Sequence, residues 1–357
     1  MRVLMLADGR SVHTVRFQGE LKAQGCTVGL ASVEPGDTVD YRFKRRSGIS
    51  GLDYTLASRE LSTFISDFKP DILNPHYASG YGYIAALGNS KNIPAVMHCL
   101  GSDILIDPYK SFLQKARSNF VLRKIPRVLV DSEFLGEKAR AISSKADSKV
   151  VYWGADDAAF DIFRDRKLES RNSAEPLRIL VPRPHKKVYN NQFIIESLSD
   201  IIREDRVEIS FPSWGEELDE FQRLADRRCP SGRVLYYPYM TRDEYNRFLG
   251  RFDIYLSASK SDSSPASLIE AMASGLYPIA ADIPGVREWL DNNNGTLFDL
   301  DKQSSLHDAI TNALEKRESV KNILIRNHEK AKIKGRFKDN IRDTLEIFRK
   351  VIEDDRW

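Results

Sequence analysis

The amino-acid sequence predicts an α/β protein made of two doubly wound domains, each with a parallel sheet between layers of helices. The chain has 357 residues, which exceeds one ordinary domain and suits two of about 170 residues each. Short apolar runs alternate with helical patterns in both halves of the chain, as in proteins built from parallel strands. A charged and polar segment, residues 163–176, separates the halves and offers little to bury.

Composition excludes several classes of protein. A hydrophobic content of 41% allows two sizeable cores, and a net charge of +3 is too small to indicate a nucleic-acid partner. The three cysteines are far apart and form no C-x-x-C pair, so we expect reduced thiols and a cytoplasmic protein. No cluster of metal-ligating residues stands out, and no segment reaches the ~18 apolar residues of a membrane span. We therefore expect no metal, no secretion and no transmembrane helix.

The first domain begins with a strand, a helix and a second strand. Residues 2–7, RVLMLA, form an apolar run typical of a buried parallel strand. Residues 12–24 then predict a helix, and residues 26–32 the next strand. Ligands bind at the strand ends of such units, and Gly9 and His13 follow the first strand. One interpretation of His13 is a solvated helix residue.

A later segment of the first domain, residues 71–76, runs from apolar into polar residues. Its sequence, DILNPH, is what a strand shows when it delivers side chains to a cleft. His76 is therefore a candidate for lining that cleft. The alternative for His76 is a packed histidine whose hydrogen bonds are satisfied by the backbone.

Residues 93–104, IPAVMHCLGSDI, predict another strand that turns at its end. Asp103 lies in this turn, where it is either a site residue or a cap of the following turn. His98 and Leu100 share one face of the strand because strand side chains alternate. His98 can therefore reach toward the same strand end, and a core histidine is the alternative.

Residues 109–127 form a basic amphipathic stretch. Six lysines and arginines alternate with apolar residues and no acid interrupts them: Lys110, Lys115, Arg117, Arg123, Lys124 and Arg127. We expect a helix that ends at about Arg123. Such a helix can lie on anionic lipid, where each basic residue contributes about 1 kcal/mol. A solvated helix face is the alternative.

The most informative stretch is residues 259–289. Ser264 as N-cap, Pro265 in the first turn and Gly275 beyond the last turn predict a short buried helix, residues 266–274. The first turn of such a helix offers free N–H groups and a positive dipole end, which suit an anion such as a diphosphate. Asp262 and Glu270 flank this site, one able to reach a sugar and the other a ribose hydroxyl. The alternative is a structural helix with two incidental acids.

This stretch resembles glycosyltransferase family 4. Asp262 to Glu270 resembles the E-x7-E motif of that family, with Asp262 where most members have Glu. The run from Glu270 to Trp289 resembles its EAMASG-x-x-P and D-x-P-G-x-x-E-W segments. The resemblance covers nearly the whole chain and includes His76 with Tyr77, and Gly154 and Asp156 with Phe160. Leu100 departs from the family, which has a histidine directly before this glycine.

The resemblance implies a GT-B fold, in which two Rossmann-like domains face each other across a cleft. We expect an acceptor-side domain at residues 1–165 and a nucleotide-sugar-binding domain at residues 166–335. A C-terminal helix, residues 336–357, would pack back on the first domain.

The resemblance also implies roles for individual residues. Asp262 would contact the transferred sugar, with Asp103 and His98 nearby, and Glu270 would hold the ribose. The residues expected to bind the donor phosphates are Gly9, Arg183, Lys187, Ser263, Ser264, Ala266, Ser267 and Leu268. His13, His76 and Tyr77 would lie on the acceptor side, and residues 237–240 would meet the nucleobase. No metal or other cofactor is implied.

The implied reaction is transfer of a sugar, with retention, from a nucleotide-sugar donor to a hydroxyl acceptor. A glycan or lipid-linked acceptor is expected, in the synthesis of a cell-surface polysaccharide, a lipid-linked glycan or a glycolipid. Residues 109–127 would then contact the inner face of the membrane. Two alternatives stay open: a non-catalytic subunit that binds nucleotide-sugar, and an epimerase or hydrolase of the same fold.

Overall fold

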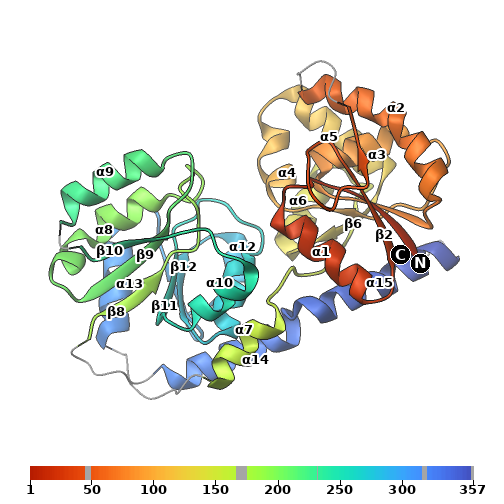
Figure 1. The fold of residues 1–357 in the computed structure, drawn as a ribbon. Coiled ribbons are helices and arrows are strands. Elements are labelled where there is room, and N and C mark those ends of the chain that lie inside the picture. Colours follow the sequence, from red (N-terminus) through yellow and green to blue (C-terminus); the bar gives the residue numbers. More distant parts are fainter. Residues whose placement is uncertain (45–49, 166–174, 231, 316–319, 355–357) are drawn as a thin grey trace. The chain divides into compact units, whose positions relative to one another are not determined.

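A computed structural model describes residues 1–44, 50–165, 175–230, 232–315 and 320–354. The chain divides into two compact units, shown in Figure 1. Unit 1 comprises Met1–Tyr152 and Lys338–Trp357, and unit 2 comprises Trp153–Phe337. Both units are parallel sheets covered by helices, so the predicted α/β class is confirmed.

The described part of unit 1 contains seven parallel strands in two hydrogen-bonded sheets. Their orders are β3-β2-β1-β4 and β5-β6-β7. The bridges Leu73–Ala95 and His76–His98, both parallel, join β4 to β5. The sheet order is therefore 3-2-1-4-5-6-7, and it reverses between β1 and β4. The strands are β1 (Arg2–Leu6), β2 (Thr27–Ser32), β3 (Tyr41–Arg42), β4 (Ile72–Pro75), β5 (Met97–His98), β6 (Arg127–Val130) and β7 (Asp147–Val150).

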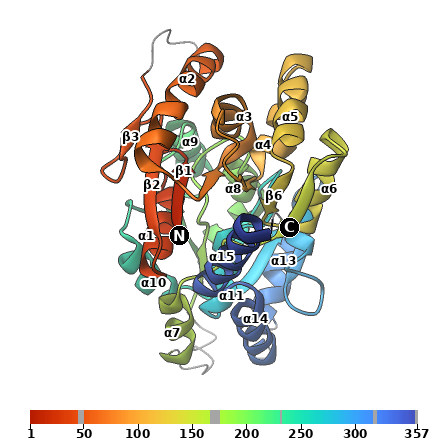
Figure 2. The same ribbon diagram turned by 90° about the vertical axis from the view of Figure 1, so that its right-hand side faces the viewer.

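Both faces of β1 are apolar, and helices cover both faces of the sheet and bury them. Val3 and Met5 face one layer, and Leu4 and Leu6 face the other. Leu4 and Leu6 join a core cluster with residues of α2, α3, α5 and α6. Figure 2 shows α1 running beside β1 and β2. The helices are α1 (Val12–Ala23), α2 (Ser50–Phe68), η1 (Tyr77–Gly82), α3 (Tyr83–Gly88), α4 (Ser102–Leu105), η2 (Asp107–Tyr109), α5 (Phe112–Lys124), α6 (Glu133–Ile142) and α15 (Phe337–Asp354).

Unit 2 has a parallel sheet of order β10-β9-β8-β11-β12-β13. This order also reverses at its first strand, between β8 and β11. The strands are β8 (Leu177–Leu180), β9 (Val207–Pro212), β10 (Val234–Tyr237), β11 (Ile254–Ser257), β12 (Tyr277–Ala281) and β13 (Thr296–Phe298). The helices are α7 (Asp157–Asp165), α8 (Asn191–Arg203), α9 (Leu218–Arg228), α10 (Arg242–Leu249), α11 (Ala266–Ala273), α12 (Pro284–Arg287), α13 (Gln303–Glu315) and α14 (Lys321–Lys334).

The units divide at Tyr152 and Trp153, earlier in the chain than the expected limit at residue 165. The reason is α7, which packs on α10, α11 and α14 and so belongs to unit 2. Phe163 of α7 stacks on His328 with 4.2 Å between ring centroids. Most of the polar segment expected between the domains, residues 166–174, lies outside the described residues.

Within the described ranges, no helix is long and apolar enough to cross a membrane.

Candidate active site

The two strand ends at the reversal point of unit 2 bring Arg183 and Asp262 together. Arg183 follows β8, Asp262 follows β11, and the Arg183 Nη2 atom donates to Asp262 Oδ2 in an ion pair. Their side chains are only 16% and 18% exposed. Ligands of open α/β sheets bind at this crevice, outside the carboxyl ends of the strands where the order reverses. The structure thus joins two of the predicted donor-site residues.

Surrounding groups keep Arg183 charged and in place. Burial opposes its charge, but the Asp262 carboxylate and nearby tyrosines more than offset burial, so the pKa of Arg183 is raised. The guanidinium carbon lies 5.2 Å from the centre of the Tyr189 ring, within range of a cation–π interaction. The Asn191 amide donates to the Arg183 carbonyl at 3.0 Å. Tyr189, on the same loop before α8, therefore supports the arginine.

Lys187, the second predicted phosphate contact, is exposed on the loop after Arg183. Its neighbour Lys186 lies 3.9 Å from Glu216. An exposed ammonium can reach an anion at the strand ends only as a flexible point charge.

Glu270, the second acid of the motif, lies inside α11 and is buried. Its Oε1 atom accepts a hydrogen bond from Arg242 Nη2 at 2.5 Å, and Arg242 Nε also pairs with Asp156. Sequence reasoning did not identify Arg242. A signal was available, because a cation in the first turn of a helix opposes the helix dipole, and Arg242 begins α10.

The start of α11 differs from the prediction. Ser264 is not the N-cap, because its Oγ accepts from the buried Trp289 indole at 2.8 Å, and Pro265 occupies the cap position. An indole N–H in a core needs such an acceptor. The Trp289 of the family-like segment thus anchors the loop that leads into the helix.

Two of the predicted phosphate donors are used within the chain. The Leu268 N–H donates to Pro265 O at 2.9 Å, and the Ser263 N–H donates to Asp262 Oδ1 at 3.0 Å. Ala266 and Ser267 occupy the first turn of α11, where an N–H group has no carbonyl one turn earlier in the helix. These two residues therefore remain candidates for phosphate contacts.

Gly285 allows the Asp262 loop to take its position. A β-carbon at Gly285 would lie 2.0 Å from Ser263 O and 2.5 Å from Asp262 O, closer than atoms can approach. The glycine of the D-x-P-G segment therefore serves close packing between α12 and this loop.

Aromatic side chains gather after β9 and β10, where the nucleobase contact is predicted. The rings of Trp214 and Tyr239 are 5.8 Å apart, and Tyr239 is 68% exposed. Tyr237 is buried, and its hydroxyl donates to Val181 O at 3.3 Å. Tyr239 is thus the member of residues 237–240 with a ring face open to a ligand.

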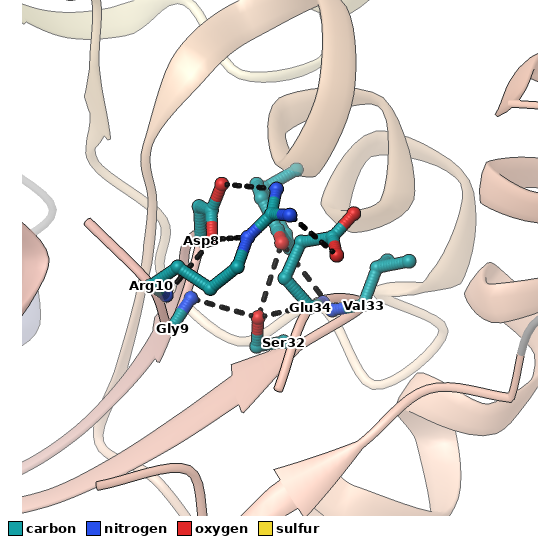
Figure 3. A network of polar contacts seen from close by, with 7 residues as sticks. Asp8, Gly9, Arg10, Ser32, Val33 and Glu34 are labelled. Carbon is teal, nitrogen blue, oxygen red and sulfur yellow. Dashed lines mark hydrogen bonds and ion pairs between the residues drawn. The ribbon is translucent and has the colours of Figure 1, made fainter. Parts of the chain in front are cut away.

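Gly9 of unit 1 lies in a polar network at the ends of β1 and β2, drawn in Figure 3. Its N–H donates to Ser32 Oγ at 3.0 Å, and the Glu34 N–H donates to the same oxygen at 3.1 Å. These bonds use both lone pairs, so the Ser32 hydroxyl hydrogen is directed to Tyr81 Oη, 3.1 Å away. Arg10 bridges Asp8 and Glu34 beside this serine. The Gly9 N–H, predicted to bind a donor phosphate, therefore already donates to a side chain of the protein.

His76 and His98 are core residues in unit 1. Asn74 joins them, since its Oδ1 accepts from His76 Nε2 at 2.8 Å and its amide donates to His98 Nδ1 at 3.1 Å. Phe17 of α1 packs edge-on against both rings. Burial lowers the pKa of His76 to about 3 and that of His98 well below its usual value. Both rings are neutral. The structure favours the alternative of packed histidines, although in these hydrogen bonds the partner is the Asn74 side chain and not the backbone.

Asp103 is fully buried and ties two loops together. One oxygen accepts from the Ala78 N–H at 2.8 Å and the other from the Leu100 N–H at 2.9 Å. Burial raises its pKa to about 6, although these bonds favour the charged form. Asp103 thus caps its own turn through Leu100, which is the alternative stated for it, and it also binds a second loop through Ala78.

The other acceptor-side candidates are placed differently. His13 is exposed on α1. Tyr77 has φ +73, which is unusual for a bulky residue, at the start of the π-helix η1. Its hydroxyl lies 2.8 Å from Ser102 Oγ. Strained backbone often occurs at functional sites, so Tyr77 stays a candidate.

The basic stretch 109–127 runs from the last residue of η2 through α5 to the first residue of β6, and α5 ends close to the expected residue. Apolar side chains stand in solvent at its start: Tyr109 is 57%, Phe112 85% and Leu113 77% exposed. Arg117 instead packs on the Tyr83 ring, at 3.9 Å from its centre.

Comparison with known proteins gives two family matches. The model of the "Glycosyl transferase 4-like" family matches residues 2–132, and that of "Glycosyl transferases group 1" matches residues 163–330. The chain is 27% identical over 271 residues to TuaC of Bacillus subtilis, named as a teichuronic acid biosynthesis glycosyltransferase. The alignment covers 72% of this chain and 64% of that relative.

Solved structures show the same fold. A sucrose-phosphate synthase from Thermosynechococcus elongatus matches with a TM-score of 0.80 at 12% identity, over 98% of this chain and 99% of that chain. A glycosyltransferase from Rickettsia africae gives 0.80 at 18%, over 99% of both chains. Anabaena HepE, in complex with UDP-glucose, gives 0.79 at 15%, over 97% of this chain and 100% of that chain.

These neighbours have the GT-B fold, and the two family matches together span most of the chain. The chain therefore belongs to the family 4-like glycosyltransferases, enzymes of the GT-B fold.

Proposed function

We propose that this enzyme transfers a sugar from a UDP-sugar to a hydroxyl group of a glycan or lipid-linked acceptor, in the synthesis of a cell-surface polysaccharide. The observation that carries the proposal is the placement of Arg183, Asp262 and the start of α11 at the reversal point of the unit 2 sheet. UDP is the nucleotide bound by HepE, and TuaC is named for polysaccharide synthesis, which supports this donor and this pathway class.

The ion pair of Arg183 with Asp262 suggests how the donor enters. A diphosphate is a better partner for a guanidinium than one carboxylate, because it offers more oxygens and more charge. Arg183 would move from Asp262 to the diphosphate, and the released Asp262 would accept from sugar hydroxyls. Ala266 and Ser267 would donate backbone N–H groups to the phosphates, and Glu270 would bind the ribose.

Catalysis would rest on stabilising the leaving diphosphate as the glycosidic bond breaks. Arg183 and the first turn of α11 supply positive charge there, so we propose a reaction that needs no metal. The acceptor oxygen bonds to the anomeric carbon, the bond from that carbon to the phosphate breaks, and the acceptor proton passes to the leaving phosphate. With attack from the face that the diphosphate leaves, the anomeric configuration is retained.

We further propose that α5 holds the enzyme at the anionic inner face of the cell membrane. Phe112 and Leu113 are largely exposed, and Lys115, Arg123 and Lys124 on the same helix are exposed as well. Apolar side chains beside cations suit the boundary of an anionic bilayer. This placement would bring the enzyme to a lipid-linked acceptor.

A turnover assay tests the reaction. Release of UDP from a panel of UDP-sugars is followed with and without a membrane extract that contains acceptors. We expect release that depends on the extract and is reduced at least about a hundredfold by Asp262→Asn, because the sugar contact is lost in the transition state. Full release without extract would contradict transfer and indicate a hydrolase. Binding without release under any condition would indicate a non-catalytic subunit.

A further inference from the structure

Arg242 connects three segments of unit 2 that are far apart in the sequence. Its Nη2 atom donates to Glu270 Oε1 inside α11 at 2.5 Å, and its Nε atom pairs with Asp156, directly before α7. The arginine itself begins α10. One guanidinium thus holds two carboxylates from two other elements.

Burial makes this contact important for Glu270. The Glu270 side chain is 6% exposed, while those of Arg242 and Asp156 are 36% and 24% exposed. A buried carboxylate without a cationic partner is strongly disfavoured and tends to take up a proton. Burial opposes the charge of Arg242, yet Glu270 and Asp156 outweigh it and raise its pKa. The arginine therefore supplies the positive partner that a carboxylate in this largely buried place needs.

Arg242 does not stabilise the helix that carries it. A cation in the first turn opposes the helix dipole. The start of α10 is secured by a capping box between Thr241 and Glu244, whose backbone and side-chain contacts are both present. Arg242 is thus placed for its contacts to other elements, and its removal should leave the start of α10 intact.

The geometry also fixes the direction of the Glu270 side chain. A carboxylate has two oxygens, each able to accept hydrogen bonds. Arg242 donates to Oε1 and is itself paired with Asp156, so one oxygen of the carboxylate is held by the protein. Oε2 is then the candidate acceptor for a ligand hydroxyl.

We propose that Arg242, anchored by Asp156, is a positioning residue that orients the Glu270 carboxylate for recognition of the donor ribose. This inference rests on the proposed binding of a UDP-sugar in unit 2. It adds a specificity-determining pair, Asp156 and Arg242, to the residues of the motif itself.

The test compares the affinity of the protein for UDP with its affinity for 2′,3′-dideoxy-UDP, which lacks the ribose hydroxyls. Both affinities are measured by titration calorimetry for the wild type, Arg242→Gln, Arg242→Lys and Glu270→Gln. We expect the wild type to prefer UDP by about tenfold or more, the usual effect of one hydrogen bond to a charged group. Arg242→Gln should bring the two affinities within about twofold, with little change for the dideoxy ligand.

Two further variants separate positioning from general stability. Arg242→Lys should restore part of the preference, because it keeps the charge but loses the fork that joins two carboxylates. Arg242→Gln should have no effect on the preference in a Glu270→Gln background. Arg233→Gln is the matched control, since Arg233 also contacts two acids, Asp205 at 2.9 Å and Glu208 at 3.7 Å, beside the start of β9 and β10.

An unchanged preference in Arg242→Gln, or an equal loss of affinity for both ligands, would overturn the inference. Should Arg242→Gln fail to fold, Asp156→Asn gives the same comparison, because it keeps the arginine and removes its anchor. Failure of the wild type to bind either nucleotide would instead contradict the proposed function, and the inference with it.

Discussion

At the scale of single residues, each acid of the motif is paired with an arginine. Asp262 pairs with Arg183 and Glu270 with Arg242. Neither carboxylate stands alone in a poorly solvated place, which is consistent with the cost of burying an unpaired charge. A ligand that enters this site must therefore exchange existing contacts, and its affinity is the difference between new and old ones.

Sequence reasoning identified Asp262 and Glu270 because they flank a predicted helix start, and the resemblance to glycosyltransferase family 4 added Arg183. It also placed His76 and His98 at strand ends, where the structure has them, whereas Asp103 lies in the short helix α4. Periodicity gives the face of a strand but not the depth of a side chain below the surface. Asn74 was decisive, since its amide satisfies both histidines within the core.

Asp103 gives a prediction of pH-dependent stability. Its pKa is raised from 3.8 to about 6 in the folded protein, so the folded state binds the proton more tightly than the unfolded state. The free energy of unfolding therefore falls as the pH rises through this window, by on the order of 3 kcal/mol. This loss is complete at about pH 7, roughly one unit above the folded pKa, where the buried carboxylate is almost fully charged.

Asp103→Asn removes this titration and serves as the reference. Urea unfolding at several pH values should show the wild type losing stability relative to the variant between about pH 4 and pH 7. A difference that stays constant, or one that grows in favour of the wild type, would show that Asp103 is not desolvated as described.

At the scale of elements, α11 shows how local rules were partly overridden. The helix was predicted over residues 266–274 and is found at Ala266–Ala273. The expected serine cap fails because Ser264 is taken by Trp289, a contact between residues 25 apart in the sequence. Long-range side-chain hydrogen bonds of this kind leave no trace in local spacing. The role of the helix start as an anion site remains a prediction.

The α5 helix carries the prediction of membrane binding. The double variant Phe112→Ser, Leu113→Ser should lower binding to phosphatidylglycerol vesicles at least about tenfold in a sedimentation assay, because two side chains no longer enter the bilayer boundary. High salt should weaken binding of the wild type, since the lysines and Arg123 contribute by charge.

Val12→Ser is the matched control for this assay. Val12 is 55% exposed on α1 of the same unit, and its removal should leave vesicle binding unchanged. Equal binding of the wild type to phosphatidylcholine and phosphatidylglycerol vesicles, or no binding to either, would contradict the proposed contact and favour a solvated helix face.

At the scale of the whole molecule, the chain forms two parallel sheets with the same strand order. Both have the order 3-2-1-4-5-6 at their core, and in both the order reverses beside the first strand. Alternating apolar runs and helical patterns were enough to predict this class. They could not locate the division at Tyr152, because the side on which α7 packs depends on tertiary contacts of its apolar face.

The central claim is that the reversal point of unit 2 binds the diphosphate of a nucleotide-sugar through Arg183. Titration calorimetry of UDP-, GDP- and ADP-glucose against the wild type, Arg183→Gln and the exposed control Arg287→Gln tests it most directly. Arg287 pairs with Asp282 at 2.5 Å on the same unit, so it matches the loss of a paired arginine.

We expect UDP-glucose to bind the wild type and Arg287→Gln alike, and to bind Arg183→Gln at least about tenfold more weakly, because a charge-assisted phosphate contact is lost and Asp262 then repels the diphosphate. Equal binding to Arg183→Gln, or no binding of any nucleotide-sugar by the folded wild type, would contradict the account.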